Sequence, residues 1–318
     1  NCCEAQYNLG LIYYEGKYVQ PDLQKAIFYF SLASNNNKES WLAQFYLGGI
    51  YLEKMHNVDK AIYYYKLSAE QNYSDAQYEL GNIYYSKEYD AFDIDKAMHY
   101  FTLAANKSKY AQYVLGNIYS EGIYVQRDIN KAIYYYTLAA NQNYDLAQLS
   151  LGNIFYNDDD VPNDTNKAIK YYSLAANQNC AEALFNLAVI YFEGKSIKRD
   201  INQAIKYYTL ASHQNMEKAN FILGTIYFMG VDVTRDIDKA IYYFTLAAND
   251  NIVDAQEILG WIYSDKKIGV FDINKAIKYF SLAADQNHLE AQNSLGVIYY
   301  SGKYVKRDLK KAIYYFNL

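Results

Sequence analysis

The sequence predicts an all-α fold: a right-handed superhelical α-solenoid of nine tandem helix-turn-helix repeats of about 36 residues. Three observations predict it. The apolar residues recur with the period of an α-helix. A Lys-Ala-Ile motif, with small variations, recurs every 35 or 36 residues, with its alanine at Ala26, Ala61, Ala97, Ala132, Ala168, Ala204, Ala240, Ala276 and Ala312. A Leu-Gly marker alternates with this motif, at Gly10, Gly48, Gly81, Gly116, Gly152, Gly224, Gly260 and Gly296, and Ala188 occupies the ninth slot.

The first helix of each repeat is illustrated by the stretch after residue 110. Ala111, Leu115, Ile118 and Tyr119 fall at i, i+4, i+7 and i+8, which is one face of a helix. Gly122 follows at the position where a left-handed residue closes a helix. Four other repeats have glycine at this position, at Gly16, Gly194, Gly230 and Gly302.

The second helix is expected to begin at an aspartate, since this side chain accepts hydrogen bonds from the first backbone amides of a helix. Asp128 has this role in the fourth repeat, with Asp22, Asp200, Asp236, Asp272 and Asp308 at matching positions. A glycine inside a helix is destabilising by about 0.5–1 kcal/mol relative to alanine. The recurrence of Leu-Gly therefore implies a packing role, and we predict that Gly116 lies against Ala132 at a close crossing of the two helices.

The markers run through the whole chain and leave no room for an independent second domain. We therefore expect residues 1–318 to form a single repeat domain. Its units are about 1–37, 38–73, 74–108, 109–144, 145–180, 181–216, 217–252, 253–288 and 289–318.

The repeated residues resemble the Sel-one-like repeat family, a relative of the tetratricopeptide repeats. The stretch from Ala111 to Ala140 follows the family pattern almost throughout, through Leu115-Gly116, Tyr119, Gly122, Val125, Asp128, Lys131-Ala132, Tyr135-Tyr136 and Ala139-Ala140. The resemblance implies a non-catalytic scaffold or adaptor that binds other proteins or peptides. Two alternatives remain: a regulatory repeat region of a larger enzyme, or a β-lactam hydrolase-like activity. Members with that activity carry a cysteine pair in each repeat, and this chain has only Cys2, Cys3 and Cys180.

Composition excludes several classes of function. The net charge is −5 and lysine and arginine are spread evenly, whereas nucleic acid needs a concentrated basic surface. No apolar run reaches the roughly 18 residues of a membrane span. The three cysteines fit free thiols in a reducing compartment, so we expect a cytoplasmic protein. The chain starts at Asn1 without a signal peptide, and we expect it to be a piece of a larger protein.

We expect no cofactor, no metal site and no catalytic residues. His56, His99, His213 and His288 do not recur at one slot of the repeat, and none has ligands at metal-binding spacing. The acidic run Asp158 to Asp160 lacks the spacing and the glycine of a calcium loop. Most of the forty tyrosines are expected to serve packing.

The candidate binding residues follow the Leu-Gly marker. In tetratricopeptide arrays the first helices line the concave surface, and the residue just after the glycine faces the groove. This slot holds Leu11, Gly49, Asn82, Asn117, Asn153, Val189, Thr225, Trp261 and Val297 in successive repeats. Asn82, Asn117 and Asn153 predict a row of amides that pairs with the backbone of a bound peptide. Nearby tyrosines are expected to add apolar contact: Tyr78, Tyr85, Tyr113 and Tyr156.

Overall fold

The computed structural model describes residues 3–35, 40–230 and 232–318, and the regular secondary structure within these ranges is entirely helical. These ranges contain eighteen α-helices, one short 3-10 helix and no strand. The predicted all-α solenoid with two helices in each repeat is confirmed.

Each repeat contributes one first helix and one second helix. The first helices are α1 (Cys3–Glu15), α3 (Trp41–Glu53), α5 (Ser74–Tyr85), α7 (Lys109–Glu121), α9 (Asp145–Asn157), α11 (Ala181–Glu193), α13 (Glu217–Met229), α15 (Val253–Ser264) and α17 (Leu289–Ser301). The second helices are α2 (Leu23–Ser34), α4 (Val58–Ala69), α6 (Ile94–Ala104), α8 (Ile129–Asn141), α10 (Thr165–Ala176), α12 (Ile201–His213), α14 (Ile237–Asn249), α16 (Ile273–Ala284) and α18 (Leu309–Asn317). The 3-10 helix η1 (Lys266–Ile268) lies in the loop of the eighth repeat.

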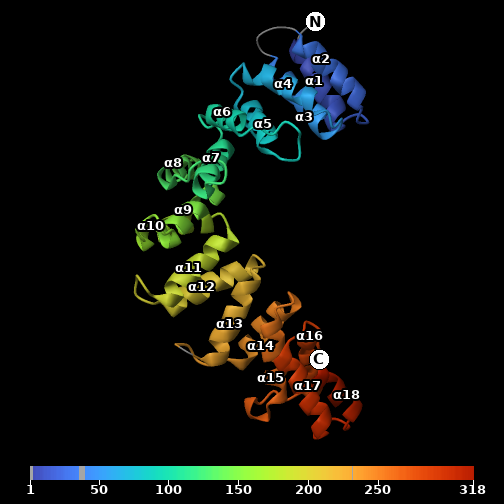
Figure 1. Cartoon of the computed structure of the whole chain (residues 1–318), viewed down its shortest axis with the longest axis vertical. Coiled ribbons are helices and arrows are strands. Elements are labelled where there is room, and N and C mark those ends of the chain that lie inside the picture. Colours follow the sequence, from blue (N-terminus) through green and yellow to red (C-terminus); the bar gives the residue numbers. More distant parts are fainter. Residues whose placement is uncertain (1–2, 36–39, 231) are drawn as a thin grey trace. The chain divides into compact units, whose positions relative to one another are not determined.

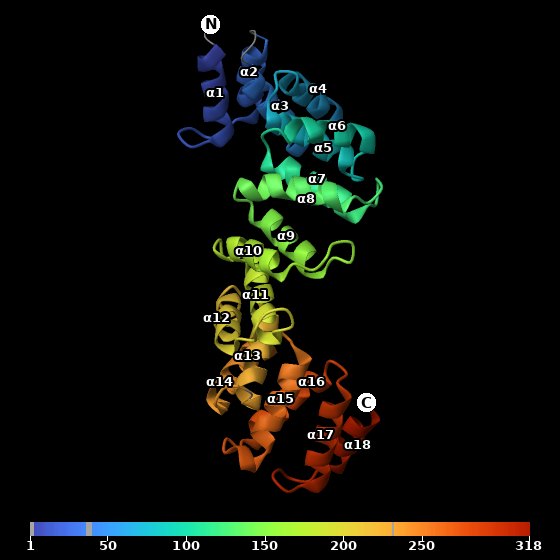
Figure 2. The ribbon, with the colours of Figure 1, turned by 90° about the vertical axis from the view of Figure 1, so that its left-hand side faces the viewer.

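The chain divides into two compact units, residues 1–163 with α1 to α9 and residues 164–318 with α10 to α18. Within each unit every helix packs against the helix before it and the helix after it (Figure 1). Figure 2 shows the same order of helices from the side. Each unit is thus built from contacts between neighbours in sequence, as expected for a repeat array.

The helix ends lie where the sequence predicts them. The Asp128 carboxylate accepts a hydrogen bond of 3.0 Å from the Lys131 backbone amide, and the other predicted aspartates cap their helices in the same way. Gly122 ends α7 with a φ of 67°, in the left-handed region that glycine adopts without strain. Asparagines at the turns between repeats are also left-handed, an additional feature shared by Asn72, Asn143, Asn179, Asn215, Asn251 and Asn287.

The marker glycine has a packing role, as the sequence predicts, and the side chain nearest to it is an aromatic ring. A Cβ built on Gly116 would lie 2.5 Å from ring carbons of Tyr136, which is one turn beyond Ala132 in α8. The nearest side chain to Gly116 is thus that of Tyr136, and the close crossing of Gly116 with Ala132 stays a prediction. An aromatic ring needs more room than a methyl group, and glycine leaves the helix surface flat for that ring in every repeat but the sixth, which has Ala188.

Buried glutamines link five of the first helices, α5, α7, α9, α15 and α17, to the second helix of the repeat before. The Gln112 side chain donates to the carbonyl oxygen of Ala105 at the end of α6, at 2.7 Å, and its own oxygen accepts from Gln142 at 2.8 Å. Gln77, Gln148, Gln256 and Gln292 donate to equivalent carbonyls. These bonds satisfy backbone oxygens that a helix end leaves without a partner.

Many tyrosines form repeated stacks between the two helices of a repeat, in agreement with the expected packing role. The Tyr119 ring of α7 lies parallel to the Tyr135 ring of α8, with centroids 5.9 Å apart and an interplanar angle of 1°. The Lys131 ammonium lies 4.9 Å from the centre of the Tyr119 ring. Tyr134, the neighbour of Tyr135, is 59% exposed on the outer side of the second helix.

Candidate functional site

The three asparagines predicted to bind a partner lie on consecutive first helices of unit 1. Asn82 is on α5, Asn117 on α7 and Asn153 on α9. Asn82 and Asn117 are half-buried, whereas Asn153 is exposed. We call the surface formed by the slot residues Gly49, Asn82, Asn117 and Asn153, with the side chains around them, the first-helix face of unit 1.

The Asn117 amide is held by the ring that packs on its own helix. The Tyr136 hydroxyl donates a hydrogen bond to the Asn117 side-chain oxygen at 2.7 Å. Tyr136 is only 4% exposed, and burial raises the pKa of its phenol, so that the hydroxyl stays protonated and acts as a donor. This bond fixes the Asn117 carboxamide and leaves its NH2 group as the donor for a ligand.

The Asn82 amide has a different neighbour. Its NH2 group donates to a carboxylate oxygen of Glu79 at 3.3 Å, one turn earlier in α5. Burial raises the pKa of Glu79; the Asn82 hydrogen bond opposes this rise and the Glu53 charge adds to it. The slot residues of consecutive repeats are therefore equivalent in position but not in chemistry.

The four tyrosines of the prediction are all half-buried, and three of them, Tyr78, Tyr85 and Tyr113, belong to aromatic clusters. Tyr78 lies 6.0 Å from both Phe101 and Tyr110, measured between ring centroids. Tyr85 contacts Phe101 and Tyr124, and Tyr113 contacts Tyr136 and Tyr144. The Tyr156 carbonyl accepts a hydrogen bond from the Asn163 side chain. These rings are held mainly by packing, so each exposes only part of its surface to a ligand.

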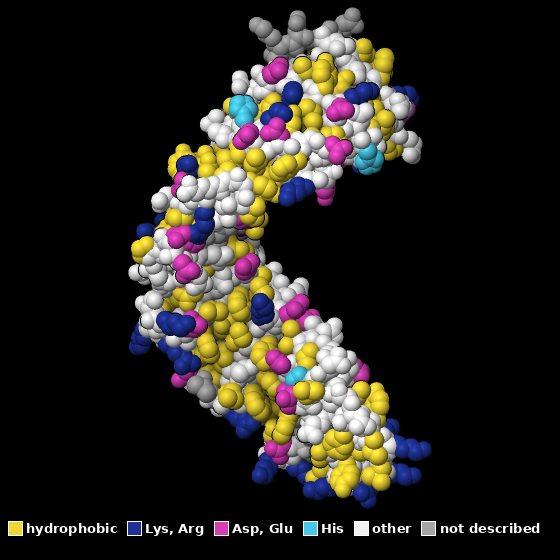
Figure 3. Space-filling model, in the orientation of Figure 1, with side chains coloured by type: hydrophobic (Ala, Val, Ile, Leu, Met, Phe, Trp, Pro, Cys, Tyr) yellow, Lys and Arg dark blue, Asp and Glu magenta, His cyan; other side chains and the backbone are white. Residues whose placement is uncertain are grey.

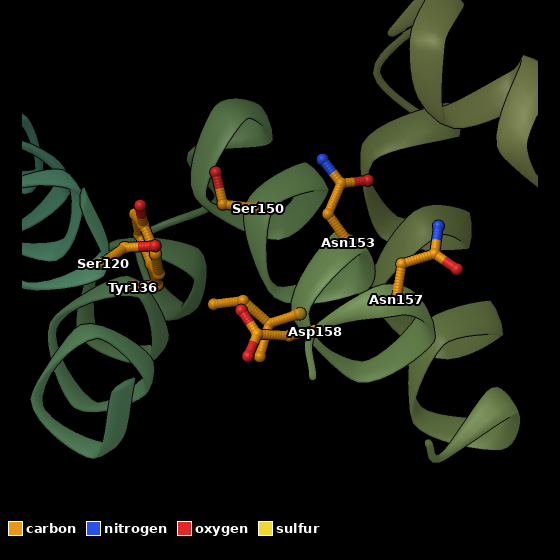
Figure 4. Close-up of a pocket in the computed structure, with 7 residues that line it drawn as sticks. Ser120, Tyr136, Ser150, Asn153, Asn157 and Asp158 are labelled. Carbon is orange, nitrogen blue, oxygen red and sulfur yellow. The ribbon is translucent and has the colours of Figure 1, made fainter. Parts of the chain in front are cut away.

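A polar cleft of about 310 Å³ opens on this face between α7, α8 and α9 (Figure 4). Side-chain hydroxyl and carboxamide groups line it, with Tyr136 at its buried side and Asn153 from the predicted row at its exposed side. The lining residues are Ser120, Tyr136, Ser150, Asn153, Ile154, Asn157 and Asp158. The Arg127 guanidinium pairs with Asp158 and Asp160 at its edge, so most groups that remain to meet a ligand are neutral donors and acceptors.

An equivalent cleft lies in unit 2, between α11, α12 and α13, with a volume of about 470 Å³. Its residues occupy the same repeat positions, 72 residues later: Phe192 replaces Ser120, Ile222 replaces Ser150, Thr225 replaces Asn153 and Met229 replaces Asn157. Hydrophobic side chains gather on the surface over these helices (Figure 3). The same backbone position is thus a polar cleft in one unit and an apolar cleft in the other.

The aromatic residue behind the marker glycine was missed as a site residue by the sequence analysis. It is tyrosine or phenylalanine in different repeats, and only tyrosine brings a hydroxyl that needs a hydrogen-bond partner. The alternation is visible in the sequence at Phe30, Tyr65, Phe101, Tyr136, Tyr172, Tyr208, Phe244, Phe280 and Phe316. Only the packing against glycine shows that this hydroxyl reaches the first-helix face.

Two other properties bear on possible functions. Among the described residues, no group of three or more histidine, cysteine, aspartate or glutamate side chains is placed to hold a metal ion. Within the same ranges, no helix has both the length and the apolar character needed to cross a membrane. Cys3 and Cys180 are half-buried, and Cys2 lies outside the described residues.

Comparison with known proteins identifies the repeat. The Sel1 repeat model matches nine consecutive segments, residues 3–38, 39–73, 74–109, 109–144, 145–180, 181–216, 217–251, 253–288 and 289–318. No curated protein sequence matches the chain. A protective antigen of uropathogenic Escherichia coli strains with an SLR fold is similar at 27% identity and a TM-score of 0.75, covering 98% of this chain and 68% of the antigen. A Sel1 repeat protein from Oxalobacter formigenes is similar at 29% identity and a TM-score of 0.69, covering 90% and 83%.

Proposed function

Because the chain belongs to the Sel1 repeat family, we propose that it is a non-catalytic scaffold that binds an extended segment of a partner protein on the first-helix face of unit 1. Proteins of this family typically act as interaction scaffolds, and no catalytic family is indicated by the comparisons. The proposal adds a surface and a mode of binding to that general role.

The observation that carries the proposal is the polar cleft beside Asn153. Its hydroxyl and carboxamide groups both donate and accept, as a peptide backbone does. A volume of about 310 Å³ accommodates part of a peptide chain rather than a folded domain. A backbone-directed row of amides also tolerates different partner sequences, which suits a scaffold.

The neighbouring slots extend the same chemistry along the face. Asn117 keeps an NH2 donor, because its oxygen is already bound by the Tyr136 hydroxyl. Asn82 lies one repeat earlier on α5, with its NH2 group on Glu79 and its oxygen as an acceptor. The half-buried rings of Tyr85 and Tyr156, one helical turn beyond Asn82 and Asn153, add apolar contact beside these polar groups.

The test compares two triple variants of the whole chain in a partner pull-down. The first changes Asn82, Asn117 and Asn153 to alanine. Losing a single hydrogen bond costs about 0.5–1.5 kcal/mol, so the triple change weakens binding roughly tenfold or more. The control changes Tyr63, His99 and Tyr134, exposed side chains at one slot of the second helices α4, α6 and α8.

A stability check belongs with this comparison, because Asn117→Ala removes the partner of the buried Tyr136 hydroxyl. Asn153→Ala alone serves as the variant that leaves the packing intact, since Asn153 is exposed. The proposal predicts that the asparagine variants lose partners and the outer-face control keeps them. A folded triple asparagine variant that keeps every partner, with a control that loses them, contradicts the proposal.

A further inference from the structure

We propose that the first-helix face of unit 1 contains a binding site for a cationic side chain, a lysine or arginine of the partner, between Glu53 of α3 and Glu79 of α5 at the hydroxyl of Tyr65. This inference rests on the proposed function and names the chemistry of one anchor residue of the bound segment.

The Tyr65 hydroxyl lacks the partner that its equivalent in the fourth repeat has. Tyr136 donates to Asn117, the slot residue of its own repeat. In the second repeat the slot residue is Gly49, which has no side chain. Tyr65 is 3% exposed, and its hydroxyl has no hydrogen-bond partner among the described residues.

Gly49 makes room at this hydroxyl. A Cβ built on Gly49 would lie 3.5 Å from the Tyr65 hydroxyl oxygen and meet no other heavy atom within 4 Å. The oxygen therefore lies directly beside the space that a side chain fills in the next three repeats. It can accept a hydrogen bond from a group that enters this space.

Two carboxylates flank the same position. Glu53 follows Gly49 by one helical turn, and Glu79 occupies the position that Ser150 and Ile222 hold in the two clefts. Both charges act on Tyr65, where burial raises the pKa of the phenol and Glu79 and Glu53 raise it further. Glu53 also raises the pKa of Tyr14, after the larger effect of burial.

These carboxylates have little positive charge to balance them in the part of the chain that the structure describes. There Glu53 has one ion pair, with the adjacent Lys54 at 3.9 Å, and both side chains are more than half exposed. Glu79 has no ion pair among the described residues, and its hydrogen bond comes from the neutral Asn82. Burial disfavours the charged form of Glu79, so an entering cation stabilises it.

The assembled groups are acceptors: two carboxylates and a phenol oxygen beside an open space. An ammonium or guanidinium group donates several hydrogen bonds and carries the charge that the carboxylates lack. It is also attracted to the faces of tyrosine rings. A neutral side chain of the same shape satisfies the geometry but not the charge, which makes the charge the property to test.

The experiment is a titration of the whole chain followed by NMR at the Gly49 amide. The probe is N-acetyl-arginine N-methylamide, and the matched control is N-acetyl-citrulline N-methylamide, its neutral isostere. We expect a saturable shift of the Gly49 resonance with the arginine probe and none with citrulline. Glu79→Gln is expected to weaken binding roughly tenfold, because a charge-assisted contact is lost.

Two further variants complete the test. Gly49→Asn fills the space and supplies Tyr65 with the partner that Asn117 gives Tyr136, so the arginine probe should no longer bind. Glu121→Gln changes the equivalent of Glu53 in the fourth repeat, where Asn117 fills the slot, and should leave binding unchanged. Equal shifts with both probes, no shift with either, or an unaltered shift of the residue 49 backbone amide in Gly49→Asn would overturn the proposal. The proposed function is refuted separately, by a folded triple asparagine variant that keeps every partner while the outer-face control loses them, because the probe titration needs no partner.

Discussion

Two adjacent glycines in α3 are predicted to respond in opposite ways to the same substitution. A Cβ added at Gly48 meets ring carbons of Tyr65 at 2.6 to 2.8 Å, whereas a Cβ added at Gly49 meets only the Tyr65 hydroxyl, at 3.5 Å. The first distance is too short for any real contact, and the second is ordinary van der Waals contact. We therefore expect Gly48→Ala to destabilise the protein and Gly49→Ala to stabilise it.

The magnitudes follow from two opposing effects. Alanine in place of glycine inside a helix stabilises by about 0.5–1 kcal/mol, and Gly49→Ala should show this gain. Overpacking a core costs about 1–3 kcal/mol, which outweighs the helical gain at Gly48 because the Tyr65 ring is buried. The sixth repeat accommodates Ala188 at this slot beside the buried Tyr208 ring. An alanine is thus tolerated in one repeat, and we place the net cost of Gly48→Ala near 1 kcal/mol.

Thermal unfolding followed by circular dichroism measures both effects in one experiment. A change of 1 kcal/mol shifts the midpoint by about 2–4 °C for units of this size. We expect Gly48→Ala to melt below the parent chain and Gly49→Ala above it. If the two variants shift in the same direction, or if Gly49→Ala is the less stable one, the account of ring-on-glycine packing is wrong.

Three further predictions concern the fold. Gly116→Leu should lower the melting midpoint, because its side chain has to displace the Tyr136 ring, and an unchanged midpoint argues against the packing role of that glycine. Gln112→Ala should cost about 1–3 kcal/mol in urea unfolding, because it leaves the Ala105 carbonyl and the Gln142 amide without their partner; a loss well below this range contradicts the linking role. Hydrogen bonds from the Lys131 amide and side chain lower the pKa of Asp128, so this cap stabilises the fold above its unfolded pKa and is lost as the pH falls through the lowered folded value. Below about pH 4 the parent chain should lose stability faster than Asp128→Asn, and identical pH profiles refute this.

The sequence predicts the helices well because the same residues recur at the helix ends from one repeat to the next. Asp128 and its equivalents mark the start of the second helix, and Gly122 and its equivalents mark the end of the first. These are local effects of one side chain on the nearest backbone groups, so they need no knowledge of the tertiary fold. The left-handed asparagines at the turns, such as Asn143, are a local backbone effect of the same kind. The sequence does not single them out, because asparagine is abundant throughout the chain.

The site could be predicted only in part, because its properties depend on contacts between repeats. The sequence gives the equivalence of Asn82, Asn117 and Asn153, but not that Tyr136 holds the Asn117 oxygen or that Glu79 holds the Asn82 amide. Gly49 shows the limit most clearly. In the sequence Gly49 only precedes the row of asparagines, whereas in the structure it leaves space beside the Tyr65 hydroxyl.

Site-specific photocrosslinking tests the central claim, binding on the first-helix face, most directly. A photoreactive p-benzoylphenylalanine is placed in turn at the position of Asn153, in the polar cleft, and at that of Tyr134, which is exposed on the outer side of α8. The account predicts that the partner is crosslinked through one short segment at the Asn153 position and is not crosslinked at the Tyr134 position. Crosslinking at the Tyr134 position alone would contradict it.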